Sequence, residues 1–147
     1  IPKLQVLGPE PLTEDFNTRY LYPRLKASSK EIKPFLLDQR LVAGIGNIYA
    51  SEILFASGVL PQRSSHSLKK KDVQAIVENT RRILLSAIEY NGTSVSDFRQ
   101  VDEKTGEFQN FLQVYDKESQ PCPRCEVPLQ RIVQQQRSTF FCIGCQK

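Results

Sequence analysis

The sequence has no apolar run long enough to span a membrane, nothing at its N-terminus that resembles a signal peptide, and no cysteine before residue 122. The first two absences exclude a membrane-spanning helix and give no sign of export, so we expect a cytoplasmic protein with no membrane partner. The single histidine, His66, lies in a polar stretch and is expected to be solvated. With 147 residues, 39% of them hydrophobic, the chain can form one ordinary domain, alone or with a small metal-bound unit.

Positive charge is unevenly distributed along the chain. The formal net charge is +4, and residues 17–50 carry six basic and two acidic groups, residues 63–88 six and two, and residues 117–147 five and two. Residues 89–116 carry two basic and six acidic groups. Such basic stretches can converge on one face that binds a polyanion, and solvated helix faces explain them equally well.

All four cysteines lie in two closely spaced pairs near the C-terminus. Two residues separate Cys122 from Cys125 and Cys142 from Cys145, and sixteen residues lie between the pairs. Each C-x2-C turn presents two thiolates to one point, and four thiolates satisfy the tetrahedral preference of zinc, so we predict one closed, structural zinc site. Two disulfides would fit only an oxidising compartment, and the N-terminus gives no sign of export. A redox-active C-x2-C motif is expected beside a βαβ pattern, and the duplication of the motif argues against this alternative.

The segment between the cysteine pairs predicts a β-hairpin. Residues 128–133 and 138–141 alternate apolar and polar side chains, and residues 134–137 lie near the tip. Because this hairpin has too little core to fold alone, we expect zinc binding to supply its folding free energy.

The first part of the chain has a helical pattern. Residues 1–11 contain three prolines and are interpreted as an extended linker. Thr13 is the expected N-cap of the first helix, and Pro23 is expected to bend or end that helix. Residues 30–37 can form a short second helix.

The strongest helical pattern covers residues 67–90, where apolar residues recur on one stripe. We expect Ser67 to be its N-cap. Ser94 is then expected to cap a short helical turn, followed by an exposed loop over residues 100–110.

Gly44-Ile45-Gly46-Asn47 opens another predicted helix, which Asn47 can cap and Gly58 ends. Small residues let a ligand approach the backbone, and the free N–H groups of a helix N-terminus favour an anion such as phosphate. Alone this turn is weak evidence, since a plain interhelical turn has the same residues. It is not a dinucleotide-binding motif, because no strand precedes it and the third glycine is missing. The chain has further cations of the kind that phosphates attract: Lys30, Lys33, Arg40 and Arg137.

Five segments occur in a recognisable order along the chain: residues 7–11, 32–37, 41–52, 112–115 and 137–142. In their residues and their order they resemble the bacterial formamidopyrimidine-DNA glycosylase family, over essentially all 147 residues. The resemblance implies a mainly α fold, in which a helix-two-turn-helix bundle is followed by a small β-hairpin zinc finger.

The resemblance also implies a division of the chain and a function. Residues 1–11 would be the linker from a missing N-terminal catalytic domain, residues 12–110 the helical DNA-binding domain, and residues 111–147 the zinc finger. Family members flip oxidised purines such as 8-oxoguanine and formamidopyrimidine out of the duplex, excise them and nick the abasic site by β,δ-elimination. Their nucleophile is an N-terminal proline with an adjacent glutamate, whereas this chain begins Ile1-Pro2-Lys3. We therefore expect a C-terminal half that is inactive alone.

Individual residues match the family's DNA-binding positions. Asn47 matches the asparagine that holds a phosphate beside the flipped nucleotide, and Lys30 and Lys33 match a lysine-rich segment that faces DNA. Arg137 matches an arginine that grips phosphate and is assigned a catalytic proton-donor role in the final elimination. A guanidinium is a poor acid, so the phosphate clamp is the better-founded role. Tyr115 matches a tyrosine near the same phosphates, with packing an equally good explanation.

Other parts of the resemblance concern partners and departures. The expected partners are damaged double-stranded DNA and one zinc ion, for a monomeric protein. Residues 100–108 correspond to the segment that folds over the damaged base. Asp116 and Glu126 stand where the family usually has glycine, which puts Cβ atoms into two tight turns.

Two alternative functions stay open at this point. The chain could be a stand-alone zinc-finger nucleic-acid-binding module without a catalytic partner. It could also belong to an enzyme with endonuclease-VIII-like specificity for oxidised pyrimidines, because the helical domain alone does not reveal the lesion.

Overall fold

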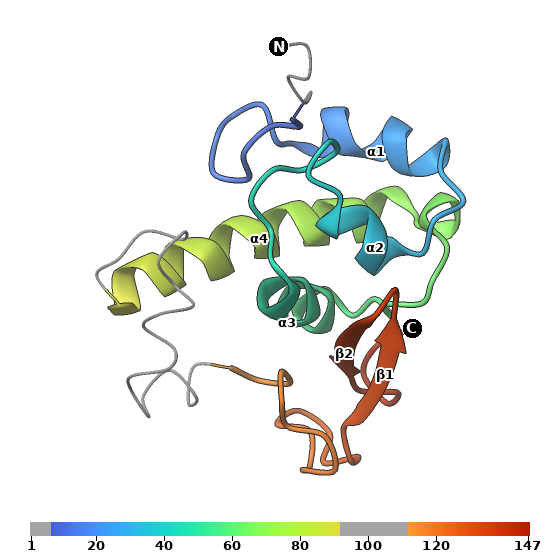
Figure 1. The fold of residues 1–147 in the computed structure, drawn as a ribbon, viewed down its shortest axis with the longest axis vertical. Helices are drawn as coiled ribbons and strands as arrows, with labels where there is room; N and C mark the ends of the chain where they lie inside the picture. Colours follow the sequence, from blue (N-terminus) through green and yellow to red (C-terminus); the bar gives the residue numbers. More distant parts are fainter. Residues whose placement is uncertain (1–6, 92–111) are drawn as a thin grey trace.

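A computed structural model describes residues 7–91 and 112–147 of the chain. In chain order the elements are α1 (Thr18–Lys26), α2 (Ile32–Leu37), α3 (Asn47–Ser57), the 3-10 helix η1 (Ser65–Ser67), α4 (Lys70–Asn91), β1 (Gln130–Gln134) and β2 (Arg137–Phe141). The helices form one bundle, and the hairpin lies against α3 at its edge (Figure 1). The predicted fold class, a mainly α bundle followed by a small β-hairpin, is confirmed. None of the described helices combines the length and the apolar character needed to cross a membrane.

The first helix begins later than the sequence pattern predicts. Thr13 is not an N-cap, because its hydroxyl donates to the Glu10 carbonyl (2.7 Å) within a preceding turn. Asn17 caps α1 instead: its backbone is extended, and its side-chain oxygen accepts from the Tyr20 N–H at 2.8 Å. Pro23 lies inside α1 and does not end it.

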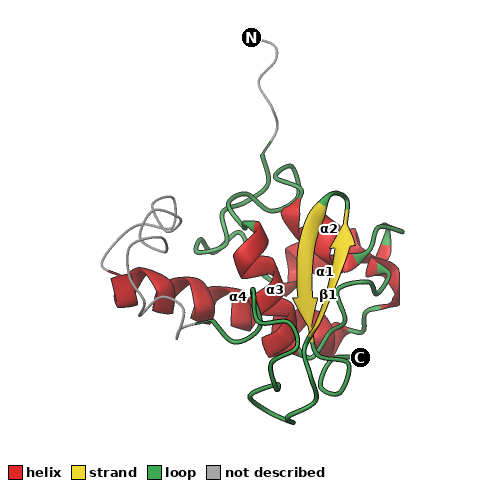
Figure 2. Ribbon diagram, turned by 60° about the horizontal axis from the view of Figure 1, so that its bottom comes forward, coloured by secondary structure: helices red, strands yellow, loops and turns green. Residues whose placement is uncertain are grey.

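Helix α3 is the most enclosed element of the described structure. Every residue from Tyr49 to Phe55 is buried, including the polar Ser51 and Glu52. A helix with no polar face must be covered all round, and α2, α4 and strand β2 all pack against α3 (Figure 2). As predicted, the helix ends at Gly58, which adopts the left-handed conformation at φ 74°.

Helix α4 begins at Lys70, so the prediction of Ser67 as its N-cap is wrong. Ser67 lies in η1, where its hydroxyl donates to the Ser64 carbonyl at 2.7 Å. Asp72 reaches back from the first turn and accepts the Lys69 N–H at 2.9 Å, which satisfies one of the free donors at the helix start. The apolar stripe predicted from the sequence faces the core and is buried at Val73, Ile76, Val77, Ile83, Leu84 and Ala87.

Two predicted elements fall outside the described residues. These are the helical turn beginning at Ser94 and the exposed loop at residues 100–110. The boundary between the two domains, placed at residues 110 and 111, also lies in this part of the chain and stays a prediction.

The predicted hairpin is present between the cysteine pairs. Strands β1 and β2 are antiparallel, with Gln134 opposite Arg137. Gln135 and Gln136 form a two-residue turn, and their φ angles of 47° and 69° are those of a type I′ turn, whose twist suits a hairpin. A second small core joins the hairpin to α3 and consists of Phe55, Val114, Cys122, Leu129, Phe140 and Cys142.

Two buried glutamine side chains hold the zinc-finger segment against the helical bundle. Gln134 donates to the Pro61 carbonyl at 3.1 Å and to the exposed Glu31 carboxylate at 2.8 Å. Gln146 accepts the Cys142 N–H at 2.7 Å and donates to the Val59 carbonyl at 2.9 Å. Packing of the finger against the bundle removes backbone N–H and C=O groups from water. The two glutamine amides form hydrogen bonds with three of these groups.

Asp116 and Glu126, the two departures from glycine, both adopt positive φ, at 64° and 69°. Both residues therefore adopt the backbone conformation that glycine prefers, which disfavours a Cβ atom by about 1–2 kcal/mol. At Glu126 the turn is closed by hydrogen bonds from its own N–H to the Cys122 carbonyl and from the Cys122 N–H to the Val127 carbonyl, both 2.9 Å.

We expect Glu126→Gly to leave the protein equally stable or up to about 1 kcal/mol more stable, because the gain from relieved strain exceeds the added chain entropy of the unfolded state. The matched change Glu126→Val should destabilise it, since a β-branched residue is strongly disfavoured at positive φ. Urea unfolding at a fixed free zinc concentration measures both effects. Equal stability of the two variants would contradict this account of the turn.

Candidate functional site

The four cysteines converge on one point, as their spacing predicts. Their Sγ atoms all lie within 4.8 Å of one another, with Cys125 and Cys142 at 3.4 Å and Cys122 and Cys145 at 3.7 Å. Four sulfurs bound to one zinc at about 2.3 Å in a tetrahedron are about 3.8 Å apart, so the observed cluster has the size that zinc requires.

The electrostatics of the cluster also call for a cation. Burial, together with hydrogen bonds from the other thiols, raises the pKa of Cys145 to about 12, and burial likewise raises the pKa of Cys142. At Cys122 the effect of burial is outweighed by hydrogen bonds, chiefly from the backbone of Arg124 and Cys125, which lower the pKa to about 7. Four neighbouring thiolates would repel one another unless a metal bound them. No position among the four ligands is left for a substrate, so the ion is structural and the chain binds one zinc through Cys122, Cys125, Cys142 and Cys145.

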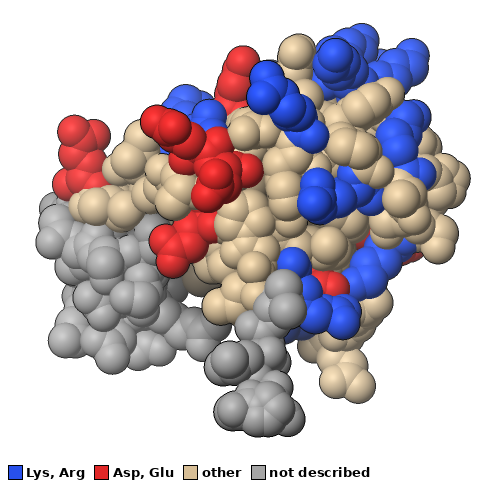
Figure 3. Space-filling model, turned by 90° about the horizontal axis from the view of Figure 1, so that it is seen from above, with Lys and Arg blue, Asp and Glu red and all other residues tan. Residues whose placement is uncertain are grey.

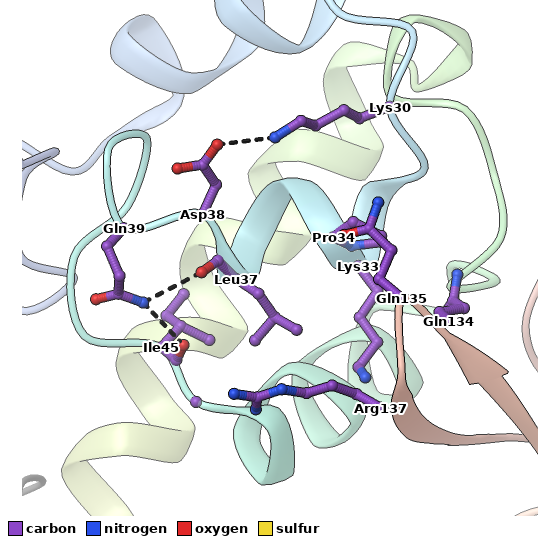
Figure 4. Close-up of a pocket in the computed structure, with 11 residues that line it drawn as sticks. Lys30, Lys33, Pro34, Leu37, Asp38, Gln39, Ile45, Gln134, Gln135 and Arg137 are labelled. Atoms are coloured by element: carbon purple, nitrogen blue, oxygen red, sulfur yellow. Dashed lines mark hydrogen bonds and ion pairs between the residues drawn. The ribbon is translucent and has the colours of Figure 1, made fainter.

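The turn before α3 is built by backbone geometry and one glutamine. Gly44 has a φ of 94°, a conformation that favours glycine. Gln39 holds the turn from inside: its side-chain oxygen accepts the Gly44 N–H at 2.7 Å, and its amide nitrogen donates to the Leu37 carbonyl at 3.2 Å and the Ile45 carbonyl at 3.5 Å (Figure 4).

Asn47 is the first residue of α3 and does not cap it with its side chain, contrary to the prediction. Gly46 is the N-cap, without a side-chain hydrogen bond. The Asn47 amide is directed toward the hairpin, where its nitrogen donates to the Ser138 carbonyl at 3.0 Å. The helix N-terminus and strand β2 are therefore in direct contact at this residue.

An open groove of about 380 Å³, which we call the α2–hairpin groove, lies between α2, the turn before α3 and the tip of the hairpin (Figure 4). Its lining residues are Lys30, Lys33, Pro34, Leu37, Asp38, Gln39, Ile45, Gly46, Gln134, Gln135 and Arg137. Arg137 is the first residue of β2. Its side chain is exposed and reaches across the groove toward the turn before α3. Within residues 7–91 and 112–147, no carboxylate forms an ion pair with Arg137.

Lys30 has a partner at the rim of the groove. Its ammonium lies 2.8 Å from the Asp38 carboxylate, which Arg40 also contacts at 2.9 Å. Hydrogen bonds from Arg40 and Lys30 hold the pKa of Asp38 well below its usual range, so this carboxylate stays ionised at neutral pH. Asp38 thus offsets part of the positive charge of Lys30 and Arg40.

Lys33 is placed differently from what the sequence suggests. We expected it to face DNA, yet its relative exposure is 0%. Its ammonium donates to the Asn47 side-chain oxygen, to the Thr139 hydroxyl at 2.8 Å and to the Ser138 carbonyl at 3.3 Å. Burial and, secondarily, the nearby Arg137 lower the pKa of Lys33 to about 8. The side chain therefore lies behind the groove surface and joins α2, α3 and β2.

Tyr115 is half-buried and packs in the interior. Its ring makes an edge contact with Phe140, with centroids 4.9 Å apart. It does not line the α2–hairpin groove. These contacts fit the packing role that the sequence left open, and a phosphate contact stays a prediction.

Glu52 is a structural residue that the sequence did not single out. Its buried carboxylate accepts the backbone N–H groups of Gln113, Val114 and Tyr115 at 2.8–3.0 Å. Burial raises the pKa of Glu52, and these three hydrogen bonds act in the opposite direction. The signal available in the sequence was that Glu52 is the one charged residue of α3, a helix whose other residues are apolar or uncharged.

Charge on the surface is segregated on at least one face. In Figure 3, Lys and Arg side chains gather on one side of the face shown, and Asp and Glu gather on the other. His66 is exposed, as expected.

Comparison with known proteins agrees with this architecture. Residues 7–99 match the formamidopyrimidine-DNA glycosylase H2TH domain, and residues 119–147 match the zinc finger found in FPG and IleRS. The chain belongs to the formamidopyrimidine-DNA glycosylase family. The fold of a helix-two-turn-helix domain with a four-cysteine zinc finger is thereby established.

Relatives and solved structures give the same result. Formamidopyrimidine-DNA glycosylase of Serratia proteamaculans is 47% identical over 141 residues, which are 96% of this chain and 52% of that protein. The Lactococcus lactis enzyme, solved non-covalently bound to DNA containing an AP site, superposes with a TM-score of 0.86 at 38% identity, over 97% of this chain and 51% of that one. MutM in complex with DNA containing carbocyclic 8-oxo-G gives a TM-score of 0.84 at 37% identity, over 97% of this chain and 51% of that one. The chain spans about half the length of the relatives it matches.

We expect about one zinc per chain by elemental analysis, and loss of that zinc in Cys142→Ser. Because zinc supplies the folding free energy of the hairpin, the variant should lose the amide resonances typical of β1 and β2 while its far-UV circular dichroism stays helical. Ile143→Ser, at an exposed neighbouring position, is the matched control and should keep the metal. A well-ordered hairpin in zinc-free protein would refute the structural role of the metal.

Proposed function

We propose that this chain is the DNA-binding part of a base-excision-repair enzyme that removes oxidised purines and cleaves the resulting abasic site. The single observation that carries the proposal is the contact of Asn47, at the start of α3, with the strand that begins at Arg137. The Asn47 amide donates to the Ser138 carbonyl, so it lies next to the residue that follows Arg137. Amide and guanidinium groups are both donors to phosphate oxygens.

The α2–hairpin groove has the electrostatic character that a phosphodiester needs. Arg137 is exposed and has no ion-pair partner among the described residues, and Lys33 adds a second positive charge behind it. Lys30 stands at the rim, tethered to Asp38. The N-terminus of α3 contributes its free backbone N–H groups to the same place. A bent sugar–phosphate strand laid across Gly46 and Arg137 would meet donors from both sides.

Residue roles follow from this arrangement. Asn47 and Arg137 would hold the phosphate beside the flipped nucleotide. Lys30 would release the Asp38 carboxylate and bind a neighbouring phosphate instead. Tyr115 would act through packing of the zinc finger. For Arg137 we favour the clamp over proton donation, because a guanidinium keeps its proton throughout the accessible pH range.

The chemistry itself would come from the part of the relatives that this chain does not match. In the reaction we propose, an amine nucleophile displaces the damaged base and forms a Schiff base with the sugar, after which elimination breaks the strand. The groove would hold the phosphates on either side of the reacting sugar while this occurs. Partners under this proposal are damaged double-stranded DNA and the catalytic half of the enzyme.

We expect the chain to bind duplex DNA with an affinity that falls steeply as salt increases. Arg137→Ala should weaken binding by roughly 10- to 100-fold and lower the salt slope by about 1, since a charged phosphate contact is lost. Asn47→Ala should weaken it by about fivefold and leave the slope unchanged, because the lost donor is neutral. Fluorescence anisotropy over a range of salt concentrations separates the two effects.

Arg131→Ala is the matched control for charge, since Arg131 is exposed on β1 and does not line the groove. It should lower affinity much less than Arg137→Ala. If Arg137→Ala and Asn47→Ala both bound DNA at low salt as tightly as the unchanged chain, the groove would not be the DNA site.

The substrate class can be tested on the longest natural polypeptide that contains this chain. Borohydride should trap a covalent complex with a duplex carrying 8-oxoguanine far more efficiently than with one carrying thymine glycol, because the proposed enzyme acts on oxidised purines. Preferential trapping on thymine glycol would instead assign the oxidised-pyrimidine specificity. No trapping on either duplex, with DNA binding intact, would favour a stand-alone binding module.

A further inference from the structure

We propose that Lys33 is a buried positioning residue that orients the Asn47 amide for phosphate, and that DNA binding at the α2–hairpin groove is linked to retention of the Lys33 proton. This inference rests on the proposed function for the DNA step, and its structural part can be tested without DNA.

The orientation of Asn47 follows from what an ammonium group can do. A protonated lysine has three N–H donors and no acceptor, so only the oxygen of the Asn47 amide can face it. The amide nitrogen is thereby turned toward the hairpin, where one of its two N–H groups donates to the Ser138 carbonyl. The second N–H has no partner among the described residues and is available to a phosphate oxygen.

The same ammonium fixes the hairpin. Its other two donors go to the Thr139 hydroxyl and the Ser138 carbonyl, both on β2, so all three are used. Lys33 comes from α2 and Asn47 from α3, which means that one cation joins three elements. Arg137 directly precedes these β2 contacts. Its position relative to Asn47 therefore depends on the Lys33 network.

The charged surroundings of Lys33 make it sensitive to an anion. From β2 it faces Arg137, while α3 and β1 present the neutral Asn47 and Gln134. On its own side of the groove, Lys30 is paired with Asp38. Among the described residues no carboxylate contacts Lys33. The Asp38 carboxylate is held by Lys30 and Arg40, and the Glu31 carboxylate accepts from Gln134. A phosphate bound by Arg137 would thus add a negative charge on the groove side of Lys33.

The expected linkage has a definite sign. Burial and Arg137 lower the pKa of free Lys33 to about 8. A bound phosphate favours the charged form and raises the pKa of Lys33 in the complex, so binding above pH 8 takes up a proton. Affinity should be constant below pH 7 and fall as pH rises through 8, by about tenfold at pH 9 if the pKa in the complex exceeds 9.

Neutral Lys33 can still be accommodated in the free protein. An amine has two donors and one acceptor, and the Thr139 hydroxyl can rotate from accepting to donating. Deprotonation should then weaken the hold on Asn47 without exposing an unpaired buried charge. Loss of the Lys33 proton therefore changes the clamp and leaves the fold intact.

The test uses the whole chain with zinc bound, lysine labelled with 13C at Cε, and asparagine labelled with 15N. An NMR titration without DNA should give a Lys33 midpoint near 8, and the Asn47 side-chain amide should shift with the same midpoint. Addition of duplex DNA at low salt should move the Lys33 midpoint upward. DNA affinity measured from pH 7 to 9 should fall by about tenfold.

Lys33→Met removes the ammonium and keeps the length of the side chain. It should bind DNA more weakly at pH 7 and show no fall in affinity between pH 7 and 9, with zinc content unchanged. Lys30→Met, at an exposed lysine of the same groove, is the matched control and should keep the pH-dependent fall. If Lys33→Met does not fold, the NMR titration of the unchanged chain decides alone.

The outcomes separate the two proposals. A Lys33 midpoint near 10, or an affinity that is constant from pH 7 to 9 in a chain that binds DNA, would overturn the linkage. If the chain does not bind DNA at all, the proposed function fails. A shared titration of Lys33 and Asn47 would then still support the positioning role, and independent titrations would refute it.

Discussion

The packing of strand β2 against helix α3 is the contact on which the α2–hairpin groove depends. Arg137 begins β2, so any shift of the strand moves the guanidinium relative to the turn before α3. Successive residues of a strand point to opposite faces, and a slip of one residue would therefore turn Arg137 and Thr139 away from Lys33. The zinc ligand Cys142 follows the strand directly, and Phe140 packs in the same small core as Phe55 of α3. The metal and this core together fix the register.

The sequence predicted the parts of the structure whose signals are local. The cysteine spacing, the hairpin between the pairs, the stripe of α4 and the glycine at the end of α3 each depend on residues within a few turns of one another. Burial of Lys33 had no such signal, because it arises from contact with Thr139, 106 positions further along the chain. A lysine in a short helix is normally exposed, and here the docked hairpin and α3 enclose its ammonium group.

Helix starts were predicted less well for a related reason. Thr13 and Asn17 both suit an N-cap. Before α4, Ser67 suits one as well, but Asp72 in the first turn instead accepts a free N–H group at the helix start. Local preference does not decide between such neighbours. The choice in α1 follows the burial of Phe16, which is fully enclosed and lies directly before Asn17. Tertiary packing thus selected one of several acceptable caps.

The positive φ of Asp116 and Glu126 can be judged by comparing energies. Each costs about 1–2 kcal/mol relative to glycine. Zinc binding by structural sites is worth on the order of 10–16 kcal/mol at neutral pH, and part of that free energy is available to hold the surrounding turns. The strain at Glu126, which lies next to the ligand Cys125, is therefore small compared with the interaction that opposes it. The turns can therefore keep their conformation with side chains at positive φ.

The same comparison applies to the cations of the groove. A buried lysine without a carboxylate beside it destabilises a folded protein, and its three neutral acceptors offset only part of that cost. A nearby acidic residue would remove the cost and would also neutralise the charge that attracts phosphate. Asp38 shows this effect at the rim, where it pairs with Lys30 and Arg40. Lys33 and Arg137 have no such carboxylate and keep their positive charge. The free protein is less stable as a result, and the same uncompensated charge attracts an anion to the groove.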